Sequence, residues 1–147
     1  MSLFDRINED IKSAMKNKDK ERLEALRAIK SELLLLKTSG KGELTEELEI
    51  QALQKMVKQR KESAKIYATE GRKELADREL KESAFIEPYL PEQLSEEEVE
   101  AAVKKIIKKT GADSMKDMGK VMGAAVKELQ GKAEGSLIAQ KVKDLLS

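Results

Sequence analysis

The chain contains no cysteine and no histidine. Without cysteine it can form no disulfide and perform no thiol chemistry. Without histidine it lacks the commonest general base and metal ligand, and the Glu-x-x-His pairs of a di-iron helical bundle cannot be built. No run of about 18 uninterrupted apolar residues occurs, and no signal peptide opens the sequence. We therefore expect a cytoplasmic protein without a membrane segment.

Aromatic residues and prolines are also scarce. Aromatics make up 3% of the 147 residues, tryptophan is missing, and there are only two prolines. Charged residues and apolar residues each account for 39%. Because the apolar residues recur at helical spacing along the whole chain, and no strand pattern is visible, the sequence predicts an all-α fold.

Both prolines lie in one segment, EPYLPEQLS, at positions 88 and 91. Proline disfavours helical geometry in the residue before it, so this segment is the strongest boundary signal in the chain. We predict an N-terminal helical domain, residues 1–92, and a C-terminal tail domain, residues 93–147.

Residues that can cap or end helices divide each predicted domain. Ser2 with Asp5, then Asp19 and Thr45, indicate an N-terminal hairpin or bundle of about four helices. In the tail, Ser95 with Glu98 forms a second capping box, Gly111 and Gly131 end helices, and the segment 114–117 is expected to cap the helix between them. The tail is therefore predicted to be a small three-helix bundle.

Three charged residues fall on apolar helix stripes of the N-terminal domain. If Gly71 is the turn of an antiparallel helical hairpin, Arg60 lies eleven residues before it and Glu82 eleven after it. An unpaired buried charge is costly, so we predict an ion pair from Arg60 to Glu82, or one turn away to Glu79. Its role would be to fix the hairpin register and not to catalyse, although perturbed carboxylates can also be acid–base groups.

Basic residues gather in the tail. Residues 1–92 hold 19 basic and 19 acidic side chains, whereas residues 101–147 hold ten lysines and five acids, a net charge of +5. On a helical wheel of the segment 115–129, one broad arc is apolar. It contains Met115, Met118, Val121, Met122, Ala125, Val126 and Leu129.

The opposite side of the same wheel carries Lys116, Lys120, Gly123 and Lys127, with Gly119 at the border. Glycine lets a partner's backbone come close, and lysine supplies a cation, which together suit a phosphodiester backbone. Lys132 and the start of the last helix can add an anion site, although Glu134 opposes it. The alternative is that both glycines admit a neighbouring helix, either from the same bundle or from the N-terminal domain. No glycine–lysine pair is followed by the hydroxyl residue of a P-loop.

Three segments together resemble the YqeY-like family: DMGKVMGAAVKELQGKAEGSL, QRKESAKIYATEGRKELADRE and YLPEQLSEEEV. The resemblance covers nearly the whole chain. This family is similar to the C-terminal helical and tail regions of the B subunit of the bacterial tRNA-dependent amidotransferase, whose tail contacts the tRNA body. The resemblance implies an all-helical protein in two parts. It also implies an RNA-binding surface at Lys116, Gly119, Lys120, Gly123, Lys127, Gly131 and Lys132.

The resemblance does not supply catalysis. Amidating a tRNA-bound carboxylate requires an ATP site with metal and a glutaminase nucleophile, and neither is visible in this sequence. We therefore expect no catalytic residue, no metal and no cofactor, and a family label of carbon–nitrogen ligase with glutamine as amido-N donor would be inherited from the larger enzyme. Family members often carry aspartate where this chain has Glu134, and glutamate is a poorer helix cap.

Three functions remain open. The first is a non-catalytic module that binds tRNA, with an aminoacyl-tRNA amidotransferase or synthetase as a possible partner. The second is a protein-interaction or scaffolding module that uses the long charged helices. The third is an enzyme with amidotransferase activity of its own. Neither DNA nor a membrane is expected as a partner. The tail has no aromatic residue for base stacking, so any RNA contact would be to phosphates and duplex shape.

Overall fold

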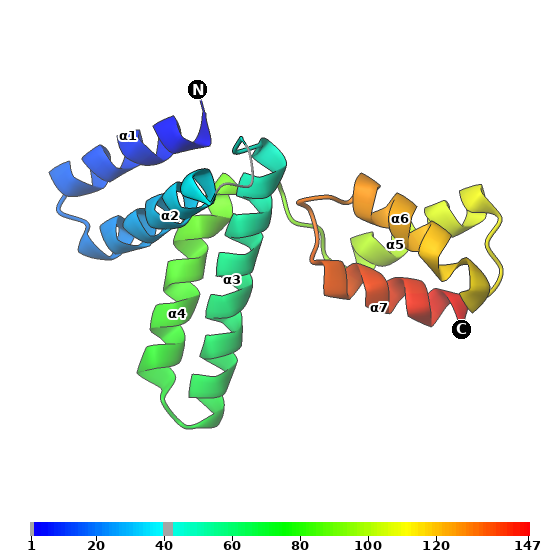
Figure 1. Cartoon of the computed structure of the whole chain (residues 1–147). Helices are drawn as coiled ribbons and strands as arrows, with labels where there is room; N and C mark the ends of the chain where they lie inside the picture. The colour runs from blue at the N-terminus through cyan, green and yellow to red at the C-terminus, as the bar shows by residue number, and fades with distance from the viewer. Residues whose placement is uncertain (1, 40–42) are drawn as a thin grey trace. The chain divides into compact units, whose positions relative to one another are not determined.

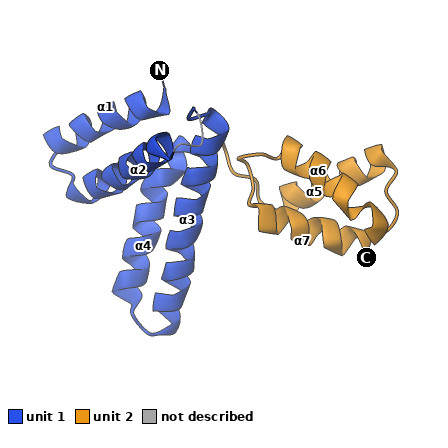
Figure 2. Cartoon of the chain, viewed as in Figure 1, with its two compact units in different colours: residues 1–90 blue, residues 91–147 orange. Residues whose placement is uncertain are grey.

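The computed structural model describes residues 2–39 and 43–147 and confirms the all-α fold, since no strand occurs within those ranges. The chain divides into two compact units, residues 1–90 (unit 1) and residues 91–147 (unit 2) (Figure 2). This division lies two residues from the boundary that Pro88 and Pro91 predicted. Within the described residues, no helix is both long enough and apolar enough to cross a membrane.

The described residues of unit 1, 2–39 and 43–90, form four α-helices and one 3₁₀ helix (Figure 1). They are α1 (Leu3–Lys16), α2 (Lys20–Thr38), α3 (Glu46–Thr69), α4 (Lys73–Ile86) and η1 (Glu87–Tyr89). The predicted caps form as expected: the Ser2 and Asp5 side chains make a capping box, and Asp19 and Thr45 each accept a backbone N–H of the first turn. Local hydrogen bonds therefore set where α1, α2 and α3 begin.

Helices α3 and α4 form an antiparallel hairpin with Gly71 at its turn (Figure 1). Gly71 has φ of +75°, a left-handed conformation that residues with a side chain rarely adopt. Ala64 on α3 and Ala76 on α4 are both buried, so small side chains fill the space between the two helices. Helix α2 packs against both members of the hairpin, and α1 packs on α2.

The core of unit 1 is mainly aliphatic and is closed at one edge by a polar contact. Its fully buried large side chains are Ile7, Leu26, Ile29, Leu33, Leu53 and Ile86. At the edge, the Tyr89 hydroxyl on η1 donates a hydrogen bond to Asp10 Oδ2 on α1. Burial, followed by this hydrogen bond, raises the pKa of Tyr89 to about 12. Every aromatic residue of the chain lies in unit 1: Phe4, Tyr67, Phe85 and Tyr89.

Unit 2 contains three α-helices that contact one another pairwise. They are α5 (Glu96–Thr110), α6 (Met118–Glu128), which follows the short 3₁₀ helix η2 (Met115–Asp117), and α7 (Gly135–Leu146). Ser95 and Glu98 form the predicted capping box, and Gly111 ends α5 with φ of +72°. The buried core is aliphatic: Val99, Val103, Ile106, Val121, Ala125, Leu129, Ala133, Ile138, Val142 and Leu146.

Candidate nucleic-acid interface

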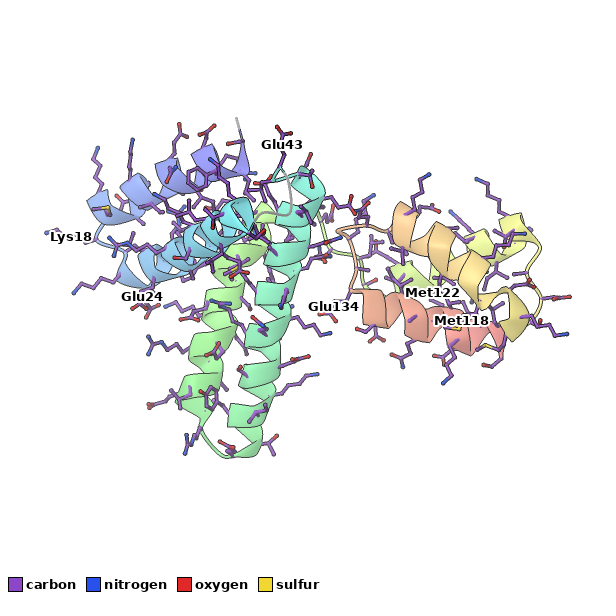
Figure 3. All side chains as sticks on the ribbon, in the orientation of Figure 1. Lys18, Glu24, Glu43, Met118, Met122 and Glu134 are labelled. Atoms are coloured by element: carbon purple, nitrogen blue, oxygen red, sulfur yellow. The ribbon has the colours of Figure 1, made fainter. Side chains whose placement is uncertain are left out.

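One side of α6 is open to solvent and carries the predicted lysines and glycines. Lys116, Gly119, Lys120, Gly123 and Lys127 are all exposed, and we call these five residues the α6 face. Val121 and Ala125 point to the core, while Met118 and Met122 pack against it (Figure 3). A Cβ built on Gly119 or Gly123 would meet no atom within 4 Å. No helix of unit 2 therefore packs on these glycines, and the interpretation that they admit one of its helices is wrong.

The apolar arc predicted for α6 is narrower in the structure. Met115 is 41% exposed and Val126 is 45% exposed, although both were predicted to face the core. On the wheel these two residues stand at the edge of the arc beside Gly119. Because only α5 and α7 are present in unit 2 to cover α6, that edge lies beyond their reach. The α6 face is therefore bordered by exposed apolar side chains on one side.

The start of α6 also differs from the prediction. The Ser114 side chain makes no capping hydrogen bond, because the Asp117 N–H bonds to the Ser114 backbone oxygen at 3.0 Å in a 3₁₀ turn. The Asp117 carboxylate instead accepts the Asp113 N–H at 3.2 Å. The α-helix consequently begins at Met118, and a carboxylate near the lysines is already engaged with the backbone.

Lys120 has a contact that the wheel could not show. Its Nζ donates a hydrogen bond to the Thr110 backbone oxygen at 3.3 Å. Thr110 is the last residue of α5, and the final carbonyls of a helix lack partners within the helix. Lys120 therefore bonds across to the C-terminal turn of α5 in addition to contributing charge to the α6 face.

Gly131 and Lys132 follow α6, and they differ in exposure. Gly131 is buried with φ of +77°, and its carbonyl oxygen accepts a hydrogen bond from Gln93 Nε2 at 2.6 Å. The Lys132 backbone oxygen accepts the Leu94 N–H at 2.8 Å, while its side chain is exposed. Gly131 thus forms a turn tied to the segment before α5 and is not part of the exposed face that the resemblance implied.

The start of α7 is a poor anion site. Glu134 occupies the N-cap position without a capping hydrogen bond, and its carboxylate accepts the Ser136 hydroxyl at 3.3 Å (Figure 3). A carboxylate at this point offsets the positive end of the helix dipole. The prediction that Glu134 opposes an anion site therefore has a structural basis.

The net charge of unit 2 depends on where counting begins. The ten lysines of residues 101–147 face five acids within that range, but the unit also includes Glu92, Glu96, Glu97, Glu98 and Glu100. Basic and acidic residues are therefore equal in number across residues 91–147. The value of +5 describes one portion of the unit, so the placement of charge within the unit matters more than its total.

In unit 1, the spacing around Gly71 predicted which charges meet. Arg60 Nε lies 3.4 Å from Glu82 Oε2, and Arg60 also donates to the Met56 backbone oxygen at 3.2 Å. Nε is buried and is not aligned for a hydrogen bond with the carboxylate. Glu82 Oε1 lies 3.9 Å from Arg78 Nε, while no ion pair from Arg60 to Glu79 is found in the described part of the chain. Of these contacts, the Arg60–Glu82 pair joins α3 to α4.

Other places in the described residues offer less for chemistry. A surface cavity of about 260 Å³ lies beside α2 and α4, and five of its charged residues pair with one another. Lys81 binds Glu21, and Arg78 binds Glu24 and Glu82. Among residues 2–39 and 43–147, no cluster of three or more His, Cys, Asp or Glu side chains could hold a metal ion.

Two comparisons relate the chain to known proteins. The family model described as Yqey-like protein matches residues 4–146, almost the whole chain. A relative from Pyrenophora tritici-repentis (strain Pt-1C-BFP), altered inheritance of mitochondria protein 41, mitochondrial, is 24% identical over 144 residues. That match covers 96% of this chain and 79% of the relative. On the extent of the family match, the chain belongs to the YqeY-like protein family.

Proposed function

We propose that the chain is a non-catalytic helical module that binds tRNA, with the lysines of the α6 face placed against backbone phosphates. The observation that carries this proposal is the open glycine surface between cations. Gly119 and Gly123 leave the α6 backbone uncovered, and Lys127 of α6 and Lys116 of the preceding η2 are exposed. A phosphodiester strand needs close approach and point charges, and both are supplied here.

The resemblance to the tail region of the amidotransferase B subunit supports the same proposal. In this proposal, an aminoacyl-tRNA amidotransferase or synthetase that shares the tRNA performs the chemistry. The label of carbon–nitrogen ligase with glutamine as amido-N donor would then describe that partner and not this chain. Contact would be to duplex regions of the tRNA, because unit 2 has no aromatic side chain on which a base could stack.

The test is the binding of unfractionated tRNA to the full chain at about 50 mM and 200 mM salt. Contacts to phosphates release counterions, so the affinity should fall steeply between the two conditions. The variant Gly123→Glu should weaken binding by introducing a side chain and a negative charge on the α6 face. The variant Gln140→Glu adds the same charge at an exposed position on α7 and is the matched control.

Lys120 is a poor choice for this test, because replacing it also removes the hydrogen bond to Thr110. Lys116→Glu and Lys127→Glu change the charge of the α6 face without breaking a hydrogen bond or an ion pair. If tRNA binds Gly123→Glu as tightly as it binds the unchanged chain, the α6 face is not the RNA-binding surface. If the unchanged chain binds no tRNA at either salt concentration, the proposed function is wrong.

A protein-interaction module is the second candidate, and one observation in unit 1 favours it. The α3–α4 hairpin exposes three large apolar side chains: Ile66 at 58%, Leu75 at 39% and Leu80 at 47%. Exposed apolar groups of this kind suit a protein partner more than an RNA. Binding through them should be nearly insensitive to salt and should weaken in Ile66→Ser, whereas binding through the α6 face should show the opposite pattern.

A further inference from the structure

Helix α5 separates charge along its length. Its first turn carries Glu96, Glu97 and Glu98, and its last turn carries Lys108 and Lys109. This order complements the helix dipole, which favours anions at the N-terminus and cations at the C-terminus. Because a helix rises 1.5 Å per residue, the acidic and basic ends of α5 lie roughly 20 Å apart. The dipole alone does not explain Lys105, which lies before the last turn.

The basic end of α5 adjoins the start of α6. The hydrogen bond from Lys120 Nζ to the Thr110 oxygen links the first turns of α6 to the residue directly after Lys109. Lys116, one turn before Lys120, belongs to the same end of the unit. The positions of these lysines on either side of the α5–α6 turn define one group, which we call the turn cluster: Lys105, Lys108, Lys109, Lys116 and Lys120.

The five lysines of the turn cluster are exposed and form no ion pair within unit 2, all of which is described. The ion pairs of residues 91–147 are Lys104 with Glu100 and Lys141 with Glu96. Of the two acids in the α5–α6 connection, Asp117 is bonded to the Asp113 N–H. The turn cluster therefore presents cations that have no acidic partner in the unit.

The other end of α6 is different. Lys127 and Lys132 at this end are equalled in number by the acids Glu128 and Glu134. The five lysines of the turn cluster are accompanied by only two acids, those of the α5–α6 connection. The start of α6 adjoins α5 and its end leads to α7. These two ends lie about 16 Å apart, because each of the eleven residues of α6 adds 1.5 Å along the helix axis. The α6 face is therefore not uniform in charge, and its cations are least offset near the α5–α6 turn.

We infer that the turn cluster is the centre of phosphate binding, with Lys105, Lys108 and Lys109 of α5 as contacts that extend the α6 face. Lys127 and Lys132 lie at the periphery. This inference rests on the proposed function and narrows it to one end of unit 2. The ligand chemistry is a row of phosphates on a duplex RNA segment, held by ammonium groups without base stacking.

The test compares two triple variants of the full chain that remove the same charge. The variant K105Q/K108Q/K109Q neutralises the α5 part of the turn cluster. The matched control, K104Q/K127Q/K132Q, neutralises three lysines outside it. Unfractionated tRNA is titrated into each protein at several salt concentrations, and the slope of log affinity against log salt is measured.

For K105Q/K108Q/K109Q we expect an affinity about tenfold or more below that of the unchanged chain, and a salt slope shallower by about two to three. The control should lose about threefold or less, with a slope changed by less than about one. The variant K105R/K108R/K109R keeps the charges and should bind as the unchanged chain does. Lys105→Gln alone leaves the last turn of α5 intact and should lower the affinity in the same direction, even if the triple variant folds poorly.

Equal losses of tRNA affinity in the two triple variants would overturn the inference, because affinity would then depend on total charge and not on the position of the lysines. Unchanged binding in K105Q/K108Q/K109Q, with tRNA still held by the unchanged chain, would overturn the inference and leave the proposed function in place. Absence of tRNA binding by the unchanged chain would overturn both. The three results are therefore distinguishable.

Discussion

The two units of this chain use their charged side chains differently. In unit 1, ion pairs join separate helices: Arg22 with Asp10, Arg60 with Glu82, Lys61 with Glu87, Arg78 with Glu24 and Lys81 with Glu21. In unit 2, Lys141 with Glu96 is the one pair that joins two helices of the described residues 91–147. Both units pack through largely aliphatic cores. Unit 1 adds ion pairs between its helices, whereas unit 2 leaves most of its lysines exposed.

This difference indicates where binding residues can be sought. A lysine that already pairs with a carboxylate must give up that contact to meet a phosphate, whereas an unpaired lysine gives up only bound ions and water. The total charge of unit 2 is balanced, so the distinction is visible only when charges are placed on the structure. The predictions below test whether the two units are independent and whether their charges have the separate roles assigned to them.

The largest effect is expected from a cavity in one core. Ile138 is 2% exposed in unit 2, and Ile138→Ala should cost about 2–5 kcal/mol, enough to unfold most of a unit of this size. Leu53→Ala is the matched change in unit 1, where Leu53 is 0% exposed. Calorimetry should show that each variant lowers one unfolding transition and leaves the other in place.

Independence can also be tested with a fragment of residues 91–147, which should be helical by circular dichroism. It retains Gln93 and Leu94, whose hydrogen bonds reach Gly131 and Lys132. An unfolded fragment, or a single transition that shifts in both alanine variants, would show that the two units fold together. The boundary at Pro88 and Pro91 would then be only a turn.

A smaller effect is expected at the α3–α4 hairpin. The Arg60 and Glu82 side chains are 18% and 25% exposed, so Glu82→Gln leaves a largely buried guanidinium without its carboxylate. We expect a loss of about 1–2 kcal/mol in urea unfolding, below the value for a fully buried pair because of this exposure. The double variant Arg60→Met, Glu82→Leu should recover most of that loss. The single variants Arg60→Met and Glu82→Leu complete a double-mutant cycle. If their losses of unfolding free energy add up in the double variant, the two residues do not stabilise each other.

The Tyr89 hydroxyl predicts a dependence on pH in unit 1. Its pKa is raised from 10.0 to about 12 in the folded chain, so the neutral phenol is favoured by folding. Stability from this group is present below pH 10 and is lost as the pH rises from 10 through 12. Because Tyr89 is only partly buried, we expect a loss of about 1 kcal/mol. Unfolding at pH 9 and pH 11.5 should show a smaller loss in Tyr89→Phe, which cannot ionise.

The smallest expected effect on stability is at Gly123, where a substitution should stabilise the protein and not destabilise it. Gly123 lies inside α6 with open space around it, so Gly123→Ala should stabilise unit 2 by about 0.5–1 kcal/mol. The same variant should weaken tRNA binding, because the added methyl group moves a phosphate strand away from the backbone. A thermal melt and a tRNA titration of one protein sample measure both. A destabilised Gly123→Ala would mean that another part of the chain packs on this position.

The sequence could predict the features that depend on neighbouring residues. The caps at Ser2, Asp19 and Ser95 form because they join a side chain to a backbone group three residues away. The Arg60–Glu82 contact could be predicted because helices are regular and Gly71 fixes the turn between them. In these cases the distance between two groups in space follows from their distance along the chain.

Features that depend on tertiary packing could not be predicted in this way. A wheel cannot show that Val126 lies beyond the cover of α5 and α7, or that Gly131 is buried by its link to Gln93. The contact between Lys120 and Thr110 joins two helices, and without it Lys105, Lys108 and Lys109 had no visible relation to α6. The sequence signal that could have indicated these lysines as binding residues is the change from acidic to basic side chains along residues 96–109.

Because all aromatic residues lie in unit 1, intrinsic fluorescence reports on that unit only. Without tryptophan, intrinsic fluorescence comes from Tyr67 and Tyr89, both in residues 1–90. An unfolding curve recorded by tyrosine emission will therefore follow unit 1 alone, and a protein whose other unit has melted will still give a native signal. A tryptophan placed at Val126, whose side chain is 45% exposed beside the α6 face, would give unit 2 its own optical probe.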